Sequence, residues 1–355
     1  MRAGLAAPLL ATLALTAAAG FSACHPRAGP VAQAEAPHAP CLPPRPPAAA
    51  APATPGMAHI PGGRFVMGGA PLLPEEGPPR PTRVAGFWID RTDVTNADFA
   101  RFVAATHYVT VAERPLDAKA WPGLSPDQRR PSGIVFAGEG GTREDAASRW
   151  RVVPGADWRH PKGPGSSIAG RDDLPVVQVA WEDALAYARW LGHDLPTEAE
   201  WEFAARGPRP PGAAPTRYVW GDQPFDPKHP QANVWQGVFP VIDTGEDGYR
   251  LAPSPVGCFP ANGWGLYDMA GDVWQWTADW YRPNLDPAGG EAPAGPSADA
   301  ATDPRDPHAA PRHVIKGGSY LCSPDYCFRY RPAAREAGPA DSGEDHVGFR
   351  TVWRG

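Results

Sequence analysis

The sequence is poor in cysteine, has no excess of basic residues and contains no long uncharged apolar segment. Only five of its 355 residues are cysteine, so the position of each one is informative. The net charge of −6 argues against nucleic-acid binding, which calls for a basic face. The apolar run from Leu5 to Gly20 is too short to cross a bilayer comfortably.

Glycine, proline and aromatic residues, by contrast, are abundant. The chain contains 39 Gly and 47 Pro, close to the range of low-complexity sequences. It also contains 14 Trp, 12 Phe and 9 Tyr, which a disordered chain would lack. This combination predicts a folded body that is rich in loops and held together by aromatic side chains.

Residues 1–23 have the features of an export signal. Arg2 gives a positive start, and the apolar run that follows ends shortly before Cys24. The tetrapeptide Phe21–Cys24 is similar to a bacterial lipoprotein cleavage box, which predicts a lipid on Cys24 and a possible membrane tether. The alternative is ordinary cleavage near Ala23, which leaves a soluble exported protein. In both cases we expect an exported chain, in the periplasm or anchored to a membrane as a lipoprotein.

Residues 24–56 form a linker of prolines set among alanines. Such a composition cannot bury a core and predicts an extended, semi-rigid spacer. Cys41 lies inside this linker, and the sequence assigns it no function. The folded domain is expected to occupy residues 57–355.

Short runs of apolar residues in this domain predict a single α+β domain with little regular secondary structure. Thr95 and Thr197 are good helix N-caps, because each is followed three residues later by an acidic residue. Glu198 and Glu200 could be mistaken for paired catalytic carboxylates, but capping and solvation explain them more simply. The remaining expected elements are strands at 60–68, 87–90, 174–179, 313–316 and 347–352, and a helix at 181–191.

Cys322 and Cys327, with four residues between them, are the most informative pair in the chain. Two thiols this close in sequence can form a local disulfide, share a soft metal ion, or carry out thiol redox chemistry. Arg329, Arg331 and Arg335 follow the pair, and cations near a thiol favour the reactive thiolate. The residues alone leave the three alternatives open.

The segment around this pair resembles the active-site segment of the formylglycine-generating enzymes. The resemblance is carried by GGSYLCSPDYCFRYRPAAR at 317–335 and HVGFR at 346–350, and LPTEAEWEFAARG at 195–207 is close to a hallmark of the wider fold superfamily. It extends over about residues 57–353 and implies the loop-rich fold of that family, which is C-type-lectin-like. It also implies a copper-dependent oxidase that uses O₂ and a thiol reductant. The implied substrate is a cysteine in a Cys-x-Pro-x-Arg-type segment of an unfolded sulfatase, which becomes Cα-formylglycine.

Carried over residue by residue, the resemblance implies a catalytic site and a substrate groove. Cys322 and Cys327 would hold copper(I) as thiolates, and Ser319 would orient the substrate thiol or oxygen by hydrogen bonding. The residues implied to line the peptide groove are Trp274, Tyr326, Arg335 and His346.

Two further segments could hold a hard cation such as calcium, which prefers carboxylate, amide and backbone oxygens. From the residues alone, the acidic turn at 243–247 is a surface turn or a metal site. The tryptophan-rich stretch at 262–280 is an aromatic core strand or a stacking platform, with core packing as the default. The resemblance implies a first calcium site at Asn233, Val234, Asp247 and Tyr249. It implies a second calcium site at Asp268, Gly271, Val273 and Gln275.

Two other functions remain open at this point. One is a non-catalytic binding or structural lipoprotein of the same fold, with Cys322 and Cys327 in a disulfide. The other is a non-haem iron sulfoxide synthase, which needs a three-histidine site usually shared with a helical domain. The ten histidines are scattered and no His-rich helical region is present, which argues against it. Cys258 lies outside these patterns and is expected to be a plain buried thiol.

Overall fold

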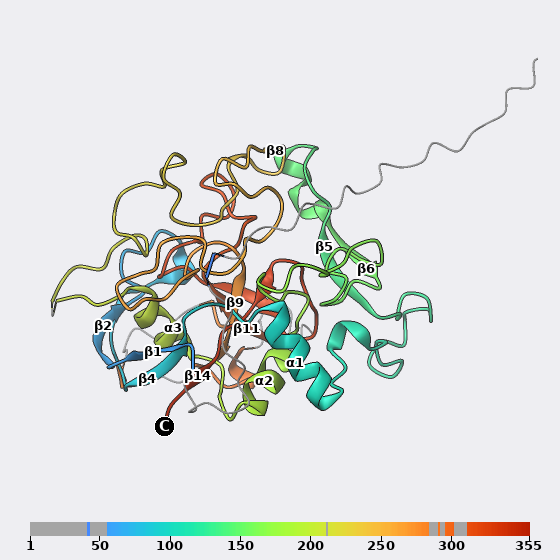
Figure 1. Ribbon diagram of the computed structural model, residues 1–355, viewed down its shortest axis with the longest axis horizontal. Coiled ribbons are helices and arrows are strands. Elements are labelled where there is room, and N and C mark those ends of the chain that lie inside the picture. Colours follow the sequence, from blue (N-terminus) through green and yellow to red (C-terminus); the bar gives the residue numbers. More distant parts are fainter. Residues whose placement is uncertain (1–40, 43–54, 211, 284–289, 292–294, 302–310) are drawn as a thin grey trace, which may run out of the picture. The chain divides into compact units, whose positions relative to one another are not determined.

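The strands around the cysteine segment form a four-stranded sheet in the computed structural model of the chain (Figure 1). Its order is β12 (Glu336–Pro339), β11 (Arg312–Lys316), β9 (Trp274–Trp280) and β13 (Val347–Gly348). The structure describes residues 41–42, 55–210, 212–283, 290–291, 295–301 and 311–355. The predicted export signal, Cys24 and most of the linker therefore lie outside the described residues.

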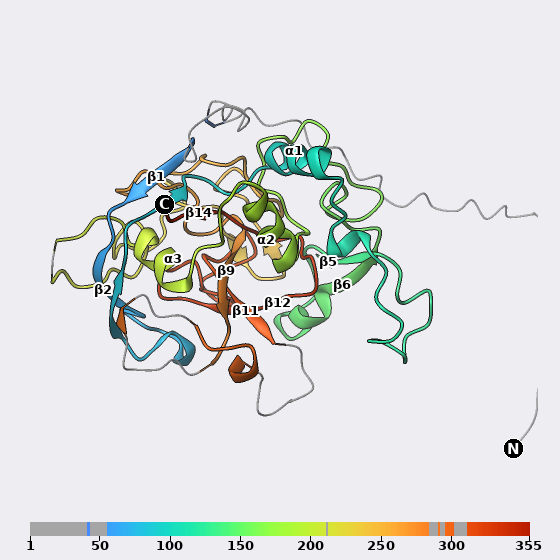
Figure 2. The same ribbon diagram turned by 90° about the horizontal axis from the view of Figure 1, so that it is seen from below.

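Two further sheets and two hairpins complete the described strands. One sheet has the order β1 (Met57–Ile60), β4 (Phe87–Asp90) and β14 (Val352–Trp353), so the first and the last strand of the domain lie on either side of β4 (Figure 2). The other has the order β10 (Gly290–Glu291), β3 (Arg80–Val84) and β2 (Gly63–Met67). The hairpins are β5 (Ser132–Phe136) with β6 (Trp150–Pro154), and β7 (Gly237–Val238) with β8 (Ile242–Asp243).

The described residues contain three α-helices, two of which begin where the capping signals predict. They are α1 (Asn96–Thr106), α2 (Trp181–Trp190) and α3 (Glu198–Ala205). The Thr95 side chain accepts the amide of Asp98 at 3.2 Å, and Thr197 accepts the amide of Glu200 at 3.1 Å, so both predicted caps are confirmed. Short 3₁₀ turns lie at Pro74–Glu76, Val111–Glu113, Arg143–Arg149 and Asp299–Ala301.

The predicted strand at 174–179 is wrong. The segment is buried, which explains its apolar run, but its backbone pairs with several loops instead of one strand. Val176 donates to the Val94 carbonyl and Gln178 to the Glu344 carbonyl. Gln178 also has a φ of 59°, which interrupts an extended conformation. The predicted last strand is likewise divided into β13 and β14, and the β5–β6 hairpin was not predicted.

The expectation that the glutamates of α3 are capping and solvated holds only for Glu200. Glu198 and Glu202 are 5% and 1% exposed and face Lys316, whose Nζ lies 3.6 and 3.4 Å from their carboxylates. Buried charges need such partners, because burial without them is costly. The helix α3 is thereby joined to the end of β11, the strand that leads into the cysteine segment.

Cys41 and Cys258 form a disulfide, which corrects two expectations. Cys258 is not a plain thiol, and Cys41 of the linker has a structural partner 217 residues away. Leu42 beside it covers Gly257, where an added Cβ would lie 2.2 Å from the leucine side chain. The sequence did not predict this pairing, because nothing local relates the two cysteines.

The described residues confirm a loop-rich α+β domain. Its largest buried cluster contains Phe99, Trp158, Tyr187, Trp276 and Phe349, in line with the abundance of aromatic residues. No helix among the described residues is long and apolar enough to span a membrane.

Candidate active site

The cysteine segment leaves β11 through two glycines in the left-handed region, Gly317 and Gly318. A Cβ on Gly318 would lie 2.9 Å from the backbone nitrogen of Tyr330, so the chain passes close to itself here. This close approach folds the segment into a compact loop at the end of the strand. The two cysteines lie on that loop.

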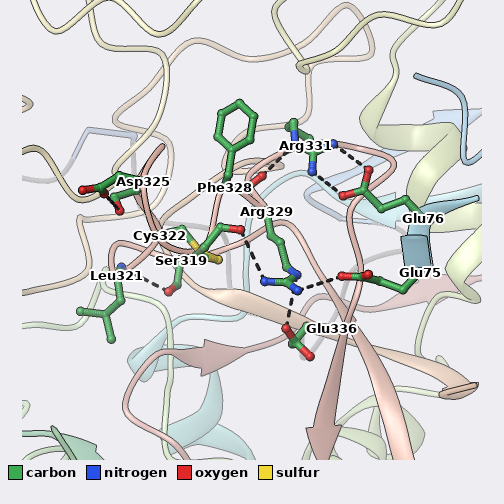
Figure 3. The surroundings of a disulfide bond; sticks show 12 residues. Glu75, Glu76, Ser319, Leu321, Cys322, Asp325, Phe328, Arg329, Arg331 and Glu336 are labelled. Carbon is green, nitrogen blue, oxygen red and sulfur yellow. Dashed lines mark hydrogen bonds and ion pairs between the residues drawn. A yellow bond between two sulfur atoms is a disulfide. The ribbon is translucent and has the colours of Figure 1, made fainter. Parts of the chain in front are cut away.

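Cys322 and Cys327 are joined as a disulfide, with their Cα atoms 4.7 Å apart (Figure 3). Cys322 is 2% exposed, and its amide donates to the Ser319 carbonyl at 2.9 Å. In this form neither sulfur is a thiolate, and a thiolate is what binds a metal or attacks as a nucleophile. The structure therefore places the pair as one unit and represents its oxidised state.

Ser319 is fully buried beside the disulfide (Figure 3). Its hydroxyl oxygen accepts the amide of Leu321 at 3.2 Å, which fixes the first turn of the loop. The structure thus brings Ser319 close to the cysteine pair along the chain, as the sequence predicts.

The arginines after the pair do not present free positive charge to it. Arg329 pairs with Glu75 at 2.8 Å and with Glu336 at 3.3 Å, and Arg331 pairs with the buried Glu76 (Figure 3). The expectation that these cations favour the thiolate is therefore corrected. Three glutamates compensate the two arginines, and two of them, Glu75 and Glu76, are distant in sequence from the cysteines.

The prediction that Arg335 lines the substrate groove is also corrected. Its guanidinium is 1% exposed and binds Glu198 through two nitrogens, at 2.8 and 2.9 Å. It also donates to the Arg282 carbonyl at 2.6 Å. All of these contacts are internal, so Arg335 holds β12 and α3 together.

Of the other three predicted groove residues, His346 and Tyr326 belong to a row of aromatic contacts, and Trp274 is joined to His346 by a backbone hydrogen bond. His346 accepts the Trp274 amide through its backbone carbonyl at 2.9 Å, and its ring packs at a tilt against Trp150, with 4.6 Å between the centroids. Tyr326 is 47% exposed and stacks on Phe239 at 4.1 Å. A row of rings continues from Trp150 through Phe136 to Phe239, with 5.4 Å between successive centroids. The structure therefore links the surroundings of His346 with the cysteine loop.

Sequence reasoning missed the residues that support this row. Phe136 and Trp150 face each other across the unpredicted β5–β6 hairpin. Asp345 accepts the Phe136 amide at 3.1 Å and the Lys162 ammonium at 2.5 Å. Burial alone would raise the pKa of Asp345, but the Lys162 charge holds it below the usual range. Local patterns gave no signal for this network, because its members come from four distant segments.

The four residues predicted for the first calcium site lie together. The Asp247 carboxylate accepts the amides of Val234 and Tyr249, at 3.1 and 3.0 Å. Asp247 is buried, and burial raises its pKa to about 6. Asn233 is buried and donates to the Asp272 carboxylate at 3.0 Å. Carboxylate, amide and backbone oxygens are available from these two segments, 233–234 and 247–249, which are the kinds of ligand that a hard cation prefers.

The second predicted calcium site fits less completely. Asp268 has one carboxylate oxygen bonded to the Gly257 amide at 2.8 Å and a second, buried oxygen without a partner among the described residues. Burial raises the pKa of Asp268, and burial together with Asp268 raises that of Asp272. Unpaired buried carboxylate oxygens of this kind suit a cation.

Gln275 is the part of that site that the structure corrects. Its amide oxygen already accepts the Trp201 indole at 2.6 Å and the Arg350 guanidinium at 2.8 Å. An amide oxygen has two lone pairs, so a metal would have to displace one of these donors. No group of three or more His, Cys, Asp or Glu side chains within the described ranges could hold a metal ion.

The fold and the site together define a class: a loop-rich α+β domain with a cysteine pair on the loop after a sheet strand. Residues 44–355 match the family described as the sulfatase-modifying factor enzyme 1-like domain. A formylglycine-generating enzyme of Mycobacterium tuberculosis is 47% identical over 83% of this chain and 97% of its own. The solved PvdO of Pseudomonas aeruginosa is 26% identical with a TM-score of 0.54, covering 83% of this chain and 93% of that one.

The chain therefore belongs to the formylglycine-generating enzyme family. Its similarity to the family's enzymes classes it with oxidases that act on a protein cysteine. An inactive Cα-formylglycine-generating enzyme 2 of mouse is also 40% identical, over 83% of this chain and 85% of its own. Because active and inactive relatives match to similar degrees, the details of the site carry the argument about turnover.

Proposed function

We propose that this protein oxidises the cysteine of a Cys-x-Pro-x-Arg-type segment in an unfolded sulfatase to Cα-formylglycine, using O₂ and a thiol reductant. The observation that carries the proposal is the placement of Cys322 and Cys327 on one short loop, with their Cα atoms 4.7 Å apart. Two sulfurs held this close form a ready donor pair once they are reduced.

Copper(I) is the cofactor that this donor pair suits, since thiolates are soft ligands and copper(I) is a soft ion. When bound, it would supply a position for the substrate sulfur and activate O₂. Cys322 and Cys327 would hold it, and Ser319 would orient the incoming group from the first turn of the loop. Tyr326, Trp274 and His346 would contact the peptide on either side of its cysteine.

The thiol reductant has a defined task in this proposal. A disulfide binds no copper(I), so the Cys322–Cys327 bond has to be opened first by thiol–disulfide exchange. The attacking thiolate forms a mixed disulfide with one cysteine and releases the other. A second reductant thiolate then frees the first cysteine and leaves as a disulfide.

We propose that calcium stabilises the loops of the two acidic segments, with the first site the better formed. Asn233, Val234, Asp247 and Tyr249 would ligate the first ion, and Asp268, Gly271 and Val273 the second. Calcium that binds only the folded state stabilises it by ~2.7 kcal/mol at a hundredfold excess over the dissociation constant. Thermal melting with a chelator and with added calcium tests this. An unchanged midpoint in both, with no calcium by elemental analysis, counts against it.

We further propose that the chain is exported through residues 1–23 and tethered by a lipid on Cys24. Mass spectrometry of the mature N-terminus distinguishes the outcomes. A lipidated Cys24 supports the tether, and an unmodified N-terminus near Cys24 leaves export without it. An intact Met1 in a cytosolic fraction contradicts both.

A second candidate function is a non-catalytic protein of the same fold. The observation in its favour is the disulfide between Cys322 and Cys327, which such a protein would keep permanently. A free-thiol count after mild reduction, with and without copper(I), separates the two functions. A catalytic pair gives two thiols that copper(I) protects, whereas a permanent disulfide gives none.

The decisive experiment is turnover of a synthetic peptide that contains Cys-x-Pro-x-Arg. The purified protein is incubated with the peptide, copper, oxygen and a thiol reductant. The product should be lighter than the substrate and carry an aldehyde that reacts with a hydrazide. If the protein binds copper(I) and leaves the peptide unchanged, the catalytic proposal fails.

A further inference from the structure

Exposed apolar side chains gather at the β7–β8 hairpin, next to the cysteine loop. Val238, Val241 and Ile242 are 46%, 41% and 49% exposed, and Tyr326 is 47% exposed. Ten large apolar side chains are at least 39% exposed in the part of the chain that the structure describes, and these are four of them. Contiguous exposed apolar surface of this kind marks a binding site more often than scattered apolar residues do.

The hairpin directs two of these side chains, Val238 and Ile242, to one side. Val238 and Ile242 are register partners in the antiparallel pair, so their side chains lie on the same face. Phe239, between them in the turn, is fully buried instead. Tyr326 covers the Phe239 ring at 4.1 Å and so joins the cysteine loop to the hairpin. We call Val238, Val241, Ile242 and Tyr326 the hairpin platform.

The backbone under the platform is firmly held. Trp235 donates its indole N–H to the Ile242 carbonyl at 3.0 Å, and the Asp243 amide donates to Glu139 at 2.6 Å. Inside the turn, the Val241 amide donates to the Val238 carbonyl at 2.7 Å. A surface that is already ordered loses little conformational entropy on binding, which favours association.

The platform is continuous with the proposed active site. The Trp235 amide donates to the Cys322 carbonyl at 3.0 Å, so the hairpin is bonded to the cysteine loop itself. Ion pairs lie at its rim, between Glu139 and Arg250 and between Arg143 and Asp325. An apolar centre with a polar rim is the usual composition of a binding interface.

We propose that the hairpin platform binds apolar side chains of the unfolded substrate polypeptide that flank its reactive cysteine. This inference rests on the proposed function, because it assigns the platform to the same substrate. An unfolded polypeptide exposes apolar side chains that its folded form would bury, and these are available only before folding. The platform thereby gives the site a means to prefer unfolded substrates.

The test compares three peptide substrates. The short peptide contains only the Cys-x-Pro-x-Arg segment. Two longer peptides of equal length contain the same segment, one with flanks of Leu and Val and the other with flanks of Ser. Ile242→Asp and Val238→Asp should each raise KM for the apolar long peptide roughly tenfold, with kcat unchanged. Both constants for the short and serine-flanked peptides should stay as in the wild type.

Val66→Asp is the matched control, since Val66 is 39% exposed on β2 in a different sheet. It should leave every constant unchanged. The double variant Val238→Thr with Ile242→Thr covers the case in which the aspartate variants do not fold. It keeps the β-branched shape, and it should also raise KM for the apolar long peptide. Equal effects on short and long peptides, or none on either, would overturn the proposal.

Binding is measured separately from turnover with a fluorescent long peptide whose cysteine is replaced by alanine. Weaker binding to Ile242→Asp than to Val66→Asp supports the platform even if no peptide is turned over, in which case the proposed function alone fails. Sedimentation tests for a second copy of the chain. A dimer that Ile242→Asp dissociates, with peptide affinity unchanged, would overturn the proposal.

Discussion

The two disulfides among the described residues close loops of very different length. Cys322 and Cys327 are 5 residues apart in sequence, whereas Cys41 and Cys258 are 217 apart. In the chain-entropy description a bond stabilises by restricting the unfolded chain, by about 2 kcal/mol for the short loop and about 5 kcal/mol for the long one. Breaking the Cys322–Cys327 bond therefore lowers the stability of the protein much less than breaking the Cys41–Cys258 bond.

Their surroundings differ in the same sense. Cys258 accepts a hydrogen bond from the Tyr249 hydroxyl at 3.1 Å, and its bond attaches the linker to the domain. Cys322 and Cys327 lie on a loop next to exposed apolar side chains, with the nearby Arg329 and Arg331 already paired. We infer that the Cys322–Cys327 pair is available for chemistry, because its cysteines are close in sequence and opening their bond lowers the stability only a little. The Cys41–Cys258 bond is structural.

The largest expected effect is on turnover, which should depend on Cys322 and Cys327 but not on the Cys41–Cys258 bond. Cys322→Ser and Cys327→Ser should each lower turnover of the short peptide at least a thousandfold, because one thiolate cannot hold the ion. The melting temperature should fall by about 4 °C, taking roughly 2 °C for each kcal/mol in a domain of this size. Peptide kinetics and calorimetry on the same samples check this. Near-normal turnover in either variant would contradict the two-thiolate site.

The reverse pattern is expected at the long-range bond. Cys41→Ser should lower the melting temperature by about 10 °C, because it removes about 5 kcal/mol of loop constraint. The kcat for the short peptide at 25 °C should not change. Cys258→Ser removes the same bond and should match it. A small shift in both variants would mean that the bond is not formed in solution.

Arg335 sharpens the comparison, because it lies on the cysteine segment but is packed as a structural residue. Arg335→Met leaves the buried Glu198 short of its partner and should lower the free energy of unfolding by about 4 kcal/mol. The KM for the short peptide should stay as in the wild type. Denaturant unfolding and peptide kinetics measure the two effects.

Arg354→Met is the control for that variant. Arg354 pairs with Glu200 at the surface, where such a pair contributes under about 1 kcal/mol. If Arg335→Met raises KM and leaves stability unchanged, the original groove assignment is right.

The smallest expected effect concerns acid and β11, the strand that leads to the local pair. His313 lies between Trp181 and Trp280, at 3.8 and 3.7 Å, and burial lowers its pKa to about 4 from 6.5. Between pH 6.5 and 4, His313 is therefore protonated in the unfolded chain but stays neutral in the folded chain. This part of the stability is complete above pH 6.5 and is lost as the pH falls toward 4, by about 2–3 kcal/mol.

His313→Phe should remove that pH dependence. Denaturant unfolding at pH 7 and at pH 4.5, for the wild type and the variant, measures the difference. Asp279, whose backbone carbonyl lies 3.1 Å from the His313 ring, is present in both proteins, so its own titration contributes to both measurements alike. A loss of stability at low pH that is the same in both would show that His313 does not carry the effect.

Local patterns in the sequence predicted several elements correctly, for reasons that are themselves local. Thr95 and Thr197 cap helices because each needs only the amide three residues ahead. The same patterns failed at 174–179, where an apolar run reports burial but not the backbone partner. They also missed the β5–β6 hairpin, whose strands are separated by a long connection and show little alternation.

The sequence by itself determined the family, the capped helices and the closeness of Cys322 and Cys327 on one short segment, since these depend on residues that are near one another in the chain. Only the tertiary structure decided what surrounds that loop. The partners of Arg329, Arg331 and Arg335, the bond from Cys41 to Cys258 and the hairpin platform all join segments far apart in sequence. Such contacts depend on how the whole chain packs, because a buried charge or a cysteine pairs with whichever suitable group the fold brings close to it.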